Sequence, residues 1–479
     1  MCVILEKEGV HSLGCMTMDN STYQSPFSWR YGSDEMRKIW SVYNTRLLWR
    51  RIWVALAEVQ VDYGLVSSDQ AGSLKNKADE IDLSRSLEME SQLQHDLMAE
   101  LKVFAGQCPD AGGILHLGAT SMDIKDNAGV LQQKSALELI LQRSKELLVV
   151  LSRLILEWVD TPLIGFTHLQ PAEPTTLGYR LAQPAQDLLK YHQELIRFAD
   201  GIKAKGFTGA VGTSASFSVL LGKENLPEFQ NKISRKLELD FYPVVNQTYP
   251  RVQDYQLLSL LAGQGAVLYK LAFDLRLLQS PVLGELAEPF GKNQVGSSAM
   301  PFKQNPIKSE KINSLGRILA QLPRTAWDNA AHSLLERTLD DSANRRIVLP
   351  EAFLCADEML VTMTDILSGL QVNEDAIQKN LAEYGPFAAT EKVLMLLSKK
   401  GADRQDMHHR LREYSLQAWA AVRKGDPNPL AGLIADDPVF LNFLSTDEIN
   451  QGMKGSGYLG DAAERAKVLA EQIKSQLDI

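Results

Sequence analysis

Apolar residues recur at steps of three and four along most of the chain, the spacing that places them on one face of an α-helix. Runs of alternating β-branched residues, which would indicate strands, are nearly absent. The pattern therefore predicts an all-α protein. Proline falls inside three of the long periodic segments and is expected to kink those helices rather than end them. The long segments are residues 127–159, 175–200, 252–279, 306–331 and 343–370, and the internal prolines are Pro184, Pro323 and Pro350.

The lengths of these helices predict how they pack. The first would have about 30 residues, or roughly 45 Å, and helices of that length side by side are typical of an extended bundle. Residues 252–279 are apolar around most of the helix, so we expect them to be covered on all sides, with partner chains contributing. We predict three helical domains: residues 1–120, a central long-helix bundle over 121–372, and 373–479.

The composition narrows the classes of partner. The chain has 479 residues, 45% of them hydrophobic and 23% charged, with a net charge of -9, so any anion site must be local and a basic nucleic-acid face is excluded. No apolar run is long enough for a membrane span or a secretory signal, which predicts a cytoplasmic protein. Residues 1–17 differ from the rest, and Met1, Met16 and Met18 are all possible translation starts.

Neither a metal nor an organic cofactor is expected. The cysteines Cys2, Cys15, Cys108 and Cys355 lack CxxC spacing, which argues against a disulfide framework and a zinc site. No glycine motif opens a strand–helix unit of the dinucleotide-binding kind. His408 and His409 are adjacent on an expected helix, so their side chains point in different directions, as surface residues do.

Two polar segments interrupt the helical pattern in the first half of the chain. In the first, Gln94, His95 and Asp96 are followed by the glycine-rich residues 117–127. There Thr120 and Ser121 either cap the long helix or offer hydroxyl and N–H groups to an anion at its positive end. The second, GFTHLQPAEPTT at 165–176, is expected to be a loop between two long helices. His168 in it is either a general acid or base or a solvated hydrogen-bonding residue.

Two further polar segments follow in the second half. In GSSAMPFKQNPIKSE, residues 296–310, a glycine is followed by two hydroxyls, a cation and an amide. A polar linker with Pro306 starting the next helix is the simpler interpretation. In ERTLDDSANRR, residues 336–346, three arginines and a serine lie among acidic residues. Arginines so clustered either bind phosphate or carboxylate, or form a surface ion-pair network with Glu336, Asp340 and Asp341.

In order along the chain, these segments resemble the three separated motifs of the fumarase/aspartase superfamily, whose members release fumarate by β-elimination. The motifs are Thr120-Ser121 with Asp123, Thr167-His168 with Gln170-Pro171-Ala172, and the highly specific SSAMPFKQNP at 297–306. Within this superfamily, the chain is similar to the adenylosuccinate lyase family, especially its animal form. That similarity rests on SWRYGSDEM, GGILHLGATS, GFTHLQPA, NQTYPR, SSAMPFKQNPIKSEK and LLERTLDDSANRR, and extends from about Tyr23 to roughly residue 430.

The resemblance implies a reaction and a set of roles. The family splits adenylosuccinate into AMP and fumarate, and the related intermediate SAICAR into AICAR and fumarate, in homotetramers whose active sites combine motifs from different subunits. Ser297, or alternatively Ser298, would be the base and His168 the acid. Lys303 and Asn305 would hold the succinyl carboxylates, with hydrogen bonds from Thr120, Ser121 and Gln247. The phosphate would meet Arg30, Tyr31, His95, Arg337, Ser342 and Arg346.

The remaining members of the implied substrate-binding set are Asp96, Thr167 and Lys311. Gln94 and Lys311 stand where the animal form has arginine, which changes how the phosphate would be held, because lysine and glutamine lack the bidentate guanidinium. Two alternatives stay open. The chain could be another lyase of the superfamily, such as argininosuccinate lyase or fumarase, or a non-catalytic protein that has kept the fold.

Overall fold

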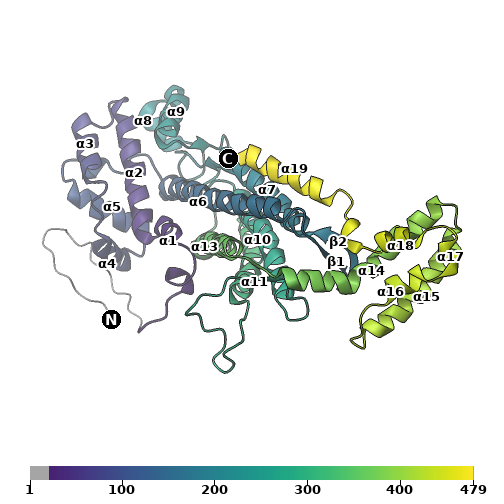
Figure 1. Cartoon of the computed structure of the whole chain (residues 1–479). Helices are drawn as coiled ribbons and strands as arrows, with labels where there is room; N and C mark the ends of the chain where they lie inside the picture. The colour runs from purple at the N-terminus through teal and green to yellow at the C-terminus, as the bar shows by residue number, and fades with distance from the viewer. Residues whose placement is uncertain (1–20, 478–479) are drawn as a thin grey trace.

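The computed structural model describes residues 21–477 and folds them almost entirely into helices, which confirms the all-α prediction. A group of helices at one end, a bundle of long helices and a second group of helices at the other end follow one another along an elongated molecule (Figure 1). The possible start sites, the N-terminal stretch judged for a secretory signal, Cys2 and Cys15 all lie outside the described residues. Within residues 21–477, no helix is both long and apolar enough to cross a membrane.

The first group of helices is built from segments that begin at good N-caps. Ser41 accepts a hydrogen bond from the N–H of Asn44, and Ser67 forms a capping box with Gln70. A 3₁₀ turn, Pro26–Ser28, precedes these helices. The helices are α1 (Asp34–Ile39), α2 (Val42–Val61), α3 (Ser68–Lys77), α4 (Leu83–Leu93) and α5 (Asp96–Gln107).

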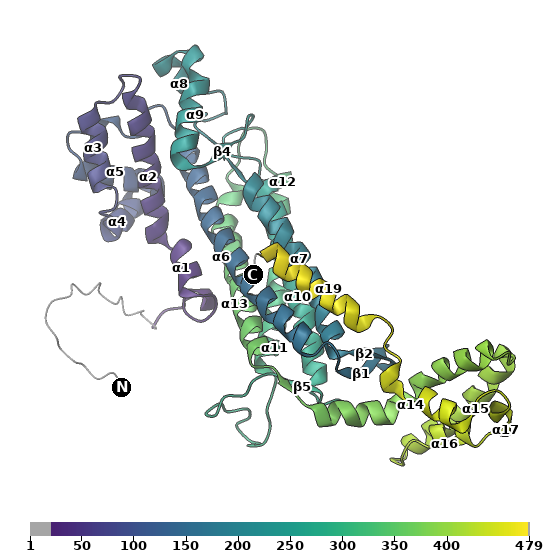
Figure 2. The same cartoon turned by 45° about the horizontal axis from the view of Figure 1, so that its top comes forward.

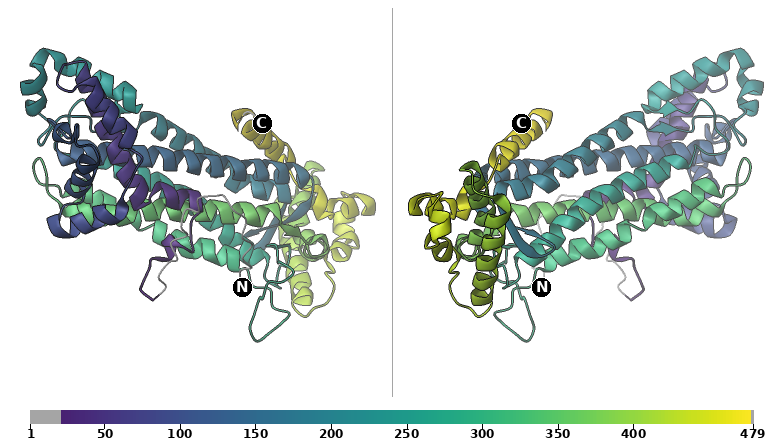
Figure 3. Two further views of the ribbon diagram at one scale, coloured as in Figure 1. Left: turned by 90° about the vertical axis from the view of Figure 1, so that its left-hand side faces the viewer. Right: turned by 90° about the vertical axis from the view of Figure 1, so that its right-hand side faces the viewer.

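The long helices pack side by side in the central bundle (Figures 2 and 3). Pro184 and Pro350 lie inside their helices, as predicted. The prediction of a single helix over 306–331 is wrong, because one helix ends at Leu319 and another begins at Leu322. Pro323 lies in the first turn of the second helix, where its missing N–H costs nothing. The helices are α6 (Ser121–Glu157), α7 (Leu177–Gly201), α10 (Val252–Leu278), α11 (Ile307–Leu319), α12 (Leu322–Ala331) and α13 (Asp340–Ser368).

Helix α10 is only partly covered within one chain. Its leucines Leu257, Leu261 and Leu268 are buried in the bundle core. On another face, Phe273 stays 55% exposed and Leu277 42% exposed. One chain therefore leaves a face of this helix uncovered, and its coverage by partner chains stays a prediction.

The segment 165–176 forms a β-hairpin instead of the predicted loop. Strands β1 (Pro162–Thr167) and β2 (Gln170–Thr176) pair antiparallel. His168 and Leu169 form the two-residue turn with φ of 53° and 59°, the left-handed geometry that suits a tight hairpin. Neither residue is glycine, so the usual sequence signal for such a turn was missing. The short pairs are β3 (Lys203–Ala204) with β4 (Asp240–Phe241), and β5 (Leu286–Ala287) with β6 (Gln371–Val372).

The last helices divide between two hydrophobic cores. Leu394, Phe440 and Ile449 belong to a core formed by α14 to α18, whereas Ile473 on α19 lies in the bundle core and Ser152 on α6 donates a hydrogen bond to Ala470 O. The helices are α14 (Glu374–Lys399), α15 (Arg404–Val422), α16 (Leu430–Ala435), α17 (Pro438–Leu441), α18 (Thr446–Gly452) and α19 (Ala462–Leu477).

At the other end of the molecule, two helices also pack in a core formed by a distant part of the sequence. Helices α8 (Ala215–Leu221) and α9 (Leu226–Leu237) share a hydrophobic core with α2, in which Phe217 and Phe229 cluster with Trp53. These helices lie in sequence between bundle helices. The domain boundaries after residues 120 and 372 stay a prediction, and two segments pack outside the continuous domain to which that prediction assigns them.

Candidate functional site

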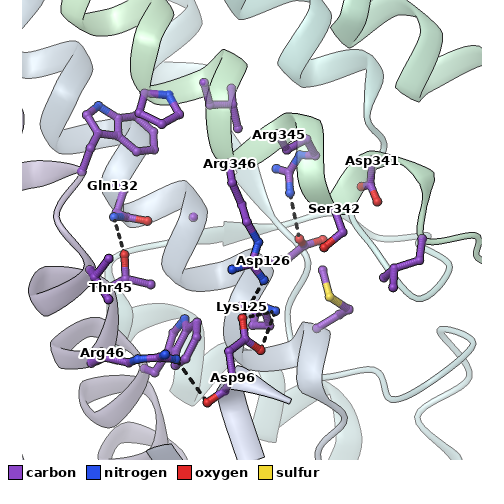
Figure 4. A pocket seen from close by; sticks show the side chains of 18 of the residues that line it. Thr45, Arg46, Asp96, Lys125, Asp126, Gln132, Asp341, Ser342, Arg345 and Arg346 are labelled. Atoms are coloured by element: carbon purple, nitrogen blue, oxygen red, sulfur yellow. Dashed lines mark hydrogen bonds and ion pairs between the residues drawn. The ribbon is translucent and has the colours of Figure 1, made fainter. Parts of the chain in front are cut away.

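A pocket of about 380 Å³ lies where the beginnings of α5, α6 and α13 meet α2 (Figure 4). We call it the Asp96 pocket. Positively and negatively charged side chains both line it. The cations are Arg46, Lys125, Arg337, Arg345 and Arg346, and the carboxylates are Glu90, Asp96, Asp126 and Asp341. Trp40, Trp49 and Leu349 add apolar wall. Four members of the predicted substrate-binding set line this pocket, namely Asp96, Arg337, Ser342 and Arg346.

Asp96 joins two cations that come from different helices. Its carboxylate accepts hydrogen bonds from Lys125 Nζ at 2.9 and 3.0 Å and from Arg346 Nη2 at 2.6 Å. Burial would raise the pKa of Asp96, but the Lys125 ammonium and the Arg346 guanidinium outweigh burial and hold this pKa far below its ordinary value. Because two cations share one carboxylate, one positive charge at this point is left over.

The other cations of the pocket are balanced by carboxylates, although Asp341 and Asp126 are shared with the buried Arg251. Arg46 pairs with Glu90 at 2.6 Å, and Arg337 with Asp341 at 2.7 Å. Arg345 donates to Asp254 at 2.8 Å. The arginine segment 336–346 therefore has both of the expected roles. Arg337 and Arg345 belong to an ion-pair network, whereas Arg346 belongs to the anion site with surplus positive charge. That surplus makes the Lys125–Arg346 side of the pocket the best place for an anion.

Three more predicted residues lie at the start of α5 and α6. His95 is the N-cap of α5, and its Nε2 lies 3.4 Å from Ser121 Oγ. Thr120 occupies the N-cap position of α6, and its backbone N–H donates to Asp123 Oδ2 at 2.9 Å. Gln247 joins this end of the molecule through its N–H, which donates to Glu336 O at 3.3 Å beside the arginine segment.

A buried ion pair fixes the first turn of α6. Asp123 and Lys205 are both fully buried and bonded to each other. Asp123 also accepts from the N–H groups of Thr208 and Gly209 at 3.2 Å. A buried charge needs such complete pairing, so this cluster holds Thr120 and Ser121 in a set position.

The middle of α13 is a second location, and it holds three more predicted residues, Arg30, Tyr31 and Lys311. Arg30 is exposed, and its guanidinium lies 5.6 Å from the Trp29 ring and 5.9 Å from the Tyr31 ring. Lys311 Nζ donates to Glu358 Oε1 at 2.5 Å. Glu358 is twelve residues beyond Arg346 on the same helix, or roughly 18 Å along its axis. This group therefore stands apart from the Asp96 pocket of its own chain.

The residues of SSAMPFKQNP form a third location, in the loop that projects from the bundle before α11 (Figures 1 and 2). We call residues 296–305 the Ser297 loop. Ser297 Oγ accepts from the N–H groups of Ala299 and Met300 at 3.3 and 3.1 Å. Asn305 Nδ2 donates to Gly296 O, and a Cβ at Gly296 would stand 2.0 Å from Lys303 O, so this loop closure requires glycine. Lys303 and Ser298 are exposed.

Thr167 and His168 occupy a fourth location at the tip of the β1–β2 hairpin, where both are exposed. The hairpin follows the last turn of α6, whereas Ser121 begins that helix. Since α6 has 37 residues, its two ends are roughly 55 Å apart. One chain therefore brings together the residues around Asp96 but keeps the proposed acid, His168, at the far end of α6 from them.

Sequence reasoning missed Lys125 and Arg46. The structure places Lys125 one turn after Ser121 on α6, with its ammonium on Asp96, and Arg46 Nη1 donates to the backbone oxygen of Asp96 at 3.1 Å. The i, i+4 spacing of Ser121 and Lys125 was a usable signal, but residues 121–126 were read as part of a polar loop, where such spacing has no meaning. Among residues 21–477, no group of three or more His, Cys, Asp or Glu side chains could hold a metal ion.

Comparisons with known proteins agree over most of the chain. The sequence model of the Lyase family matches residues 35–319, and that of the adenylosuccinate lyase C-terminus matches residues 386–468, so the likeness continues past residue 430, where it was expected to fade. The adenylosuccinate lyase of Saccharomyces cerevisiae is 37% identical over 95% of both chains. That of Pyrococcus horikoshii is 33% identical over 94% of this chain and 98% of the relative.

Solved structures show the same fold. A fumarate lyase from Mesorhizobium has a TM-score of 0.82 at 26% identity, and the 3-carboxy-cis,cis-muconate lactonizing enzyme from Pseudomonas putida has 0.84 at 25%. Each comparison covers 94% of this chain and 99% of the other. With a helical bundle of this fold, relatives above 30% identity over nearly the full length and a matching C-terminal family, the chain belongs to the adenylosuccinate lyase family, lyases that release fumarate.

Proposed function

We propose that this chain cleaves adenylosuccinate into AMP and fumarate, and SAICAR into AICAR and fumarate, in purine nucleotide biosynthesis. The observation that carries the proposal is the surplus positive charge where Lys125 and Arg346 share Asp96. Both substrates carry a phosphate and two carboxylates, and an acidic protein needs a local concentration of positive charge to hold them. The substrates of fumarase and argininosuccinate lyase carry no phosphate, so those enzymes have no need of such a site.

The phosphate is held by Arg346 and Ser342, with Lys125 as an added ligand. Ser342 lies in the first turn of α13 and lines the same pocket, so the positive end of that helix favours an anion there. Lys125 supplies positive charge on Asp96, two residues after Gln94, which stands where the family form has arginine. Arg30, Tyr31, His95 and Arg337 complete the phosphate contacts.

The elimination breaks one carbon–nitrogen bond. The Ser297 oxygen takes a proton from the carbon next to the one that bears nitrogen, the electrons of that C–H bond form the new double bond, and the C–N electrons leave with nitrogen. His168 then donates a proton to the leaving nitrogen. Lys303 and Asn305 hold the succinyl carboxylates, and Thr120, Ser121, Thr167 and Gln247 add hydrogen bonds.

A neutral serine is a weak base, so its alkoxide must be stabilised. The two N–H groups that donate to Ser297 Oγ, from Ala299 and Met300, support this role. They provide the partial positive charge that favours a serine oxyanion, as an oxyanion hole does. The arrangement favours Ser297 over Ser298 as the base.

The active site is completed by other copies of the chain in a homotetramer. Two observations support this proposal. The ends of α6, which hold Ser121 and lead to His168, are roughly 55 Å apart, too far for one substrate to bridge. Phe273 and Leu277 also leave an apolar face of α10 exposed, which a second copy can cover. The cytoplasmic location is a prediction from sequence that belongs to the same proposal.

The test is fumarate release from adenylosuccinate and from argininosuccinate, followed by absorbance with the purified protein. We expect fumarate from adenylosuccinate and none from argininosuccinate. Release from argininosuccinate alone would keep the elimination chemistry and overturn the substrate. No release from either would favour a non-catalytic protein that has kept the fold.

A further inference from the structure

The backbone of Tyr31, Gly32 and Ser33 is fixed on both sides. Arg37 Nη1 donates to Tyr31 O at 3.0 Å and to Gly32 O at 2.6 Å. From α13, Glu358 Oε2 accepts the N–H of Gly32 at 2.9 Å, and Asp357 Oδ2 accepts that of Ser33 at 2.6 Å. These bonds leave the segment little freedom to move along α13.

Gly32 makes this docking possible. Its φ is 79°, a region that side chains disfavour, and a Cβ there would stand 2.4 Å from Leu354 Cδ2. The close approach brings the N–H of Gly32 within reach of the Glu358 carboxylate. Arg30 and Tyr31 immediately precede this anchor, so their side chains start from a backbone of fixed position.

Glu358 also reaches the helix that leaves the Ser297 loop. Its other oxygen, Oε1, accepts from Lys311 Nζ at 2.5 Å and from Thr362 Oγ1 at 3.2 Å. Lys311 lies near the start of α11, six residues beyond Asn305. The Glu358 side chain is 15% exposed, so solvent screens its carboxylate only in part. One carboxylate therefore connects α13, α11 and the segment that carries Arg30.

We propose that Glu358 is a positioning residue, which holds the Arg30–Tyr31 segment in place for the substrate phosphate, and that Lys311 acts through Glu358 rather than on the substrate. The inference rests on the proposed function, because it takes Arg30 and Tyr31 as phosphate ligands. The inference changes the role expected for Lys311, because the Lys311 ammonium is directed to Glu358. Lys311 and Glu358 together fix the distance between α11, which follows the Ser297 loop, and residues 30–33.

The isosteric change Glu358→Gln isolates this role. A carboxylate accepts at both oxygens, whereas an amide accepts at only one, so glutamine cannot serve Lys311 and Gly32 together. The segment then loses its fixed position while the volume of the side chain is kept. Because phosphate contacts act in the ground state and the transition state alike, the loss raises KM and leaves kcat nearly unchanged.

Asp365→Asn is the matched control. Asp365 pairs with Lys308 at 2.7 Å, so it joins the same helices α13 and α11 about two turns farther along but contacts no part of residues 30–33. Four proteins are compared with the wild type: Glu358→Gln, Lys311→Met, the double variant and Asp365→Asn. Each is assayed for kcat and KM with adenylosuccinate and for Tm. Amide hydrogen exchange of Gly32 and Ser33 reports on the segment directly.

We expect Glu358→Gln and Lys311→Met each to raise KM about tenfold with kcat within about twofold, and the double variant to be no worse than Glu358→Gln, because partners in one contact are not additive. Exchange at Gly32 rises in Glu358→Gln and stays at the wild-type rate in Asp365→Asn.

Two outcomes overturn the inference in an active enzyme: a KM for Glu358→Gln equal to that of Asp365→Asn, or additive effects in the double variant. If Glu358→Gln does not fold, Lys311→Met decides, because the Lys311 side chain is 34% exposed and we expect this variant to fold. An unchanged KM in Lys311→Met also overturns the inference. A wild type that releases no fumarate overturns the proposed function instead.

Discussion

Ser121 and His168 are separated by helix α6, whose two ends are roughly 55 Å apart. Ser121 begins the helix beside the Asp96 pocket, and His168 lies at the tip of the hairpin that follows the last turn. The proposed mechanism needs both residues at one substrate. It therefore requires that different chains contribute them.

Shared active sites predict complementation. In a hybrid of His168→Ala and Arg346→Ala subunits, some sites receive an intact His168 from one chain and an intact Arg346 from another. We expect the co-expressed, doubly tagged hybrid to be at least about tenfold more active than either variant alone. A hybrid of Arg346→Ala and Arg337→Ala is the control, because both residues belong to one pocket and every site stays defective. Equal activity in the two hybrids would contradict shared sites.

His168 is predicted to act in the chemical step. Because the side chain is exposed at a hairpin tip, His168→Ala should leave Tm nearly unchanged and lower kcat at least about a hundredfold, the usual weight of general acid catalysis. His168→Asn is the sharper variant, since asparagine tolerates the left-handed φ of this turn but cannot donate a proton as imidazolium does. Full activity of His168→Asn would remove His168 from the mechanism.

Lys125 is predicted to bind the phosphate. Its ammonium is part of the surplus charge on Asp96, so Lys125→Met should raise KM for adenylosuccinate about tenfold, the effect of losing one charge-assisted hydrogen bond. Steady-state kinetics test this, with Lys134→Met as control. Lys134 lies on the same helix but donates to Glu238 O outside the pocket. A tenfold change in both variants would point to a general effect of charge.

Asp96 should contribute stability that depends on pH. Burial opposes its ionisation, but Lys125 and Arg346 hold its pKa well below the value of about 4 in an unfolded chain. A group with a depressed folded pKa stabilises fully above its unfolded pKa, and this contribution is lost as pH falls below about 4. Asp96→Asn should thus cost about 2 kcal/mol of unfolding free energy at pH 7, since it leaves two cations unpaired.

Denaturant unfolding of the wild type and Asp96→Asn at several pH values measures this cost. The difference in unfolding free energy should shrink as the pH is lowered from 5 to 3. A difference that stays constant over this range would mean that packing rather than charge makes Asp96 important. Glu90, which pairs with Arg46 in the same pocket and is more exposed, gives a comparison site.

Local properties of the chain were readable from sequence. The long helices follow from the spacing of apolar residues, which acts within each segment and needs no knowledge of neighbours. Helix α6 was recognised, although it begins at Ser121 rather than near Asn127, because Thr120 and Asp123 provide a start signal that the glycine-rich context obscured. The family motifs were likewise local strings.

Properties that depend on contacts were not readable. The hairpin at His168 has no glycine in its turn and no alternating pattern, so only its packing against α14 and α7 makes the strands favourable. The break before Pro323 depends on how α11 and α12 pack on α10. The role of Lys125 required knowing that Asp96 and Arg346, 250 residues apart in sequence, meet in space.

The sequence by itself determined the helical class, the extents of most long helices and the chemical groups available to the reaction, because these depend on residues close together in the chain. Only the tertiary structure decided which groups share a pocket, that two cations there share one carboxylate, and that Lys311 is directed to Glu358. The physical reason is that charge balance and distance are properties of side chains brought together by packing, and packing is set by the whole bundle at once.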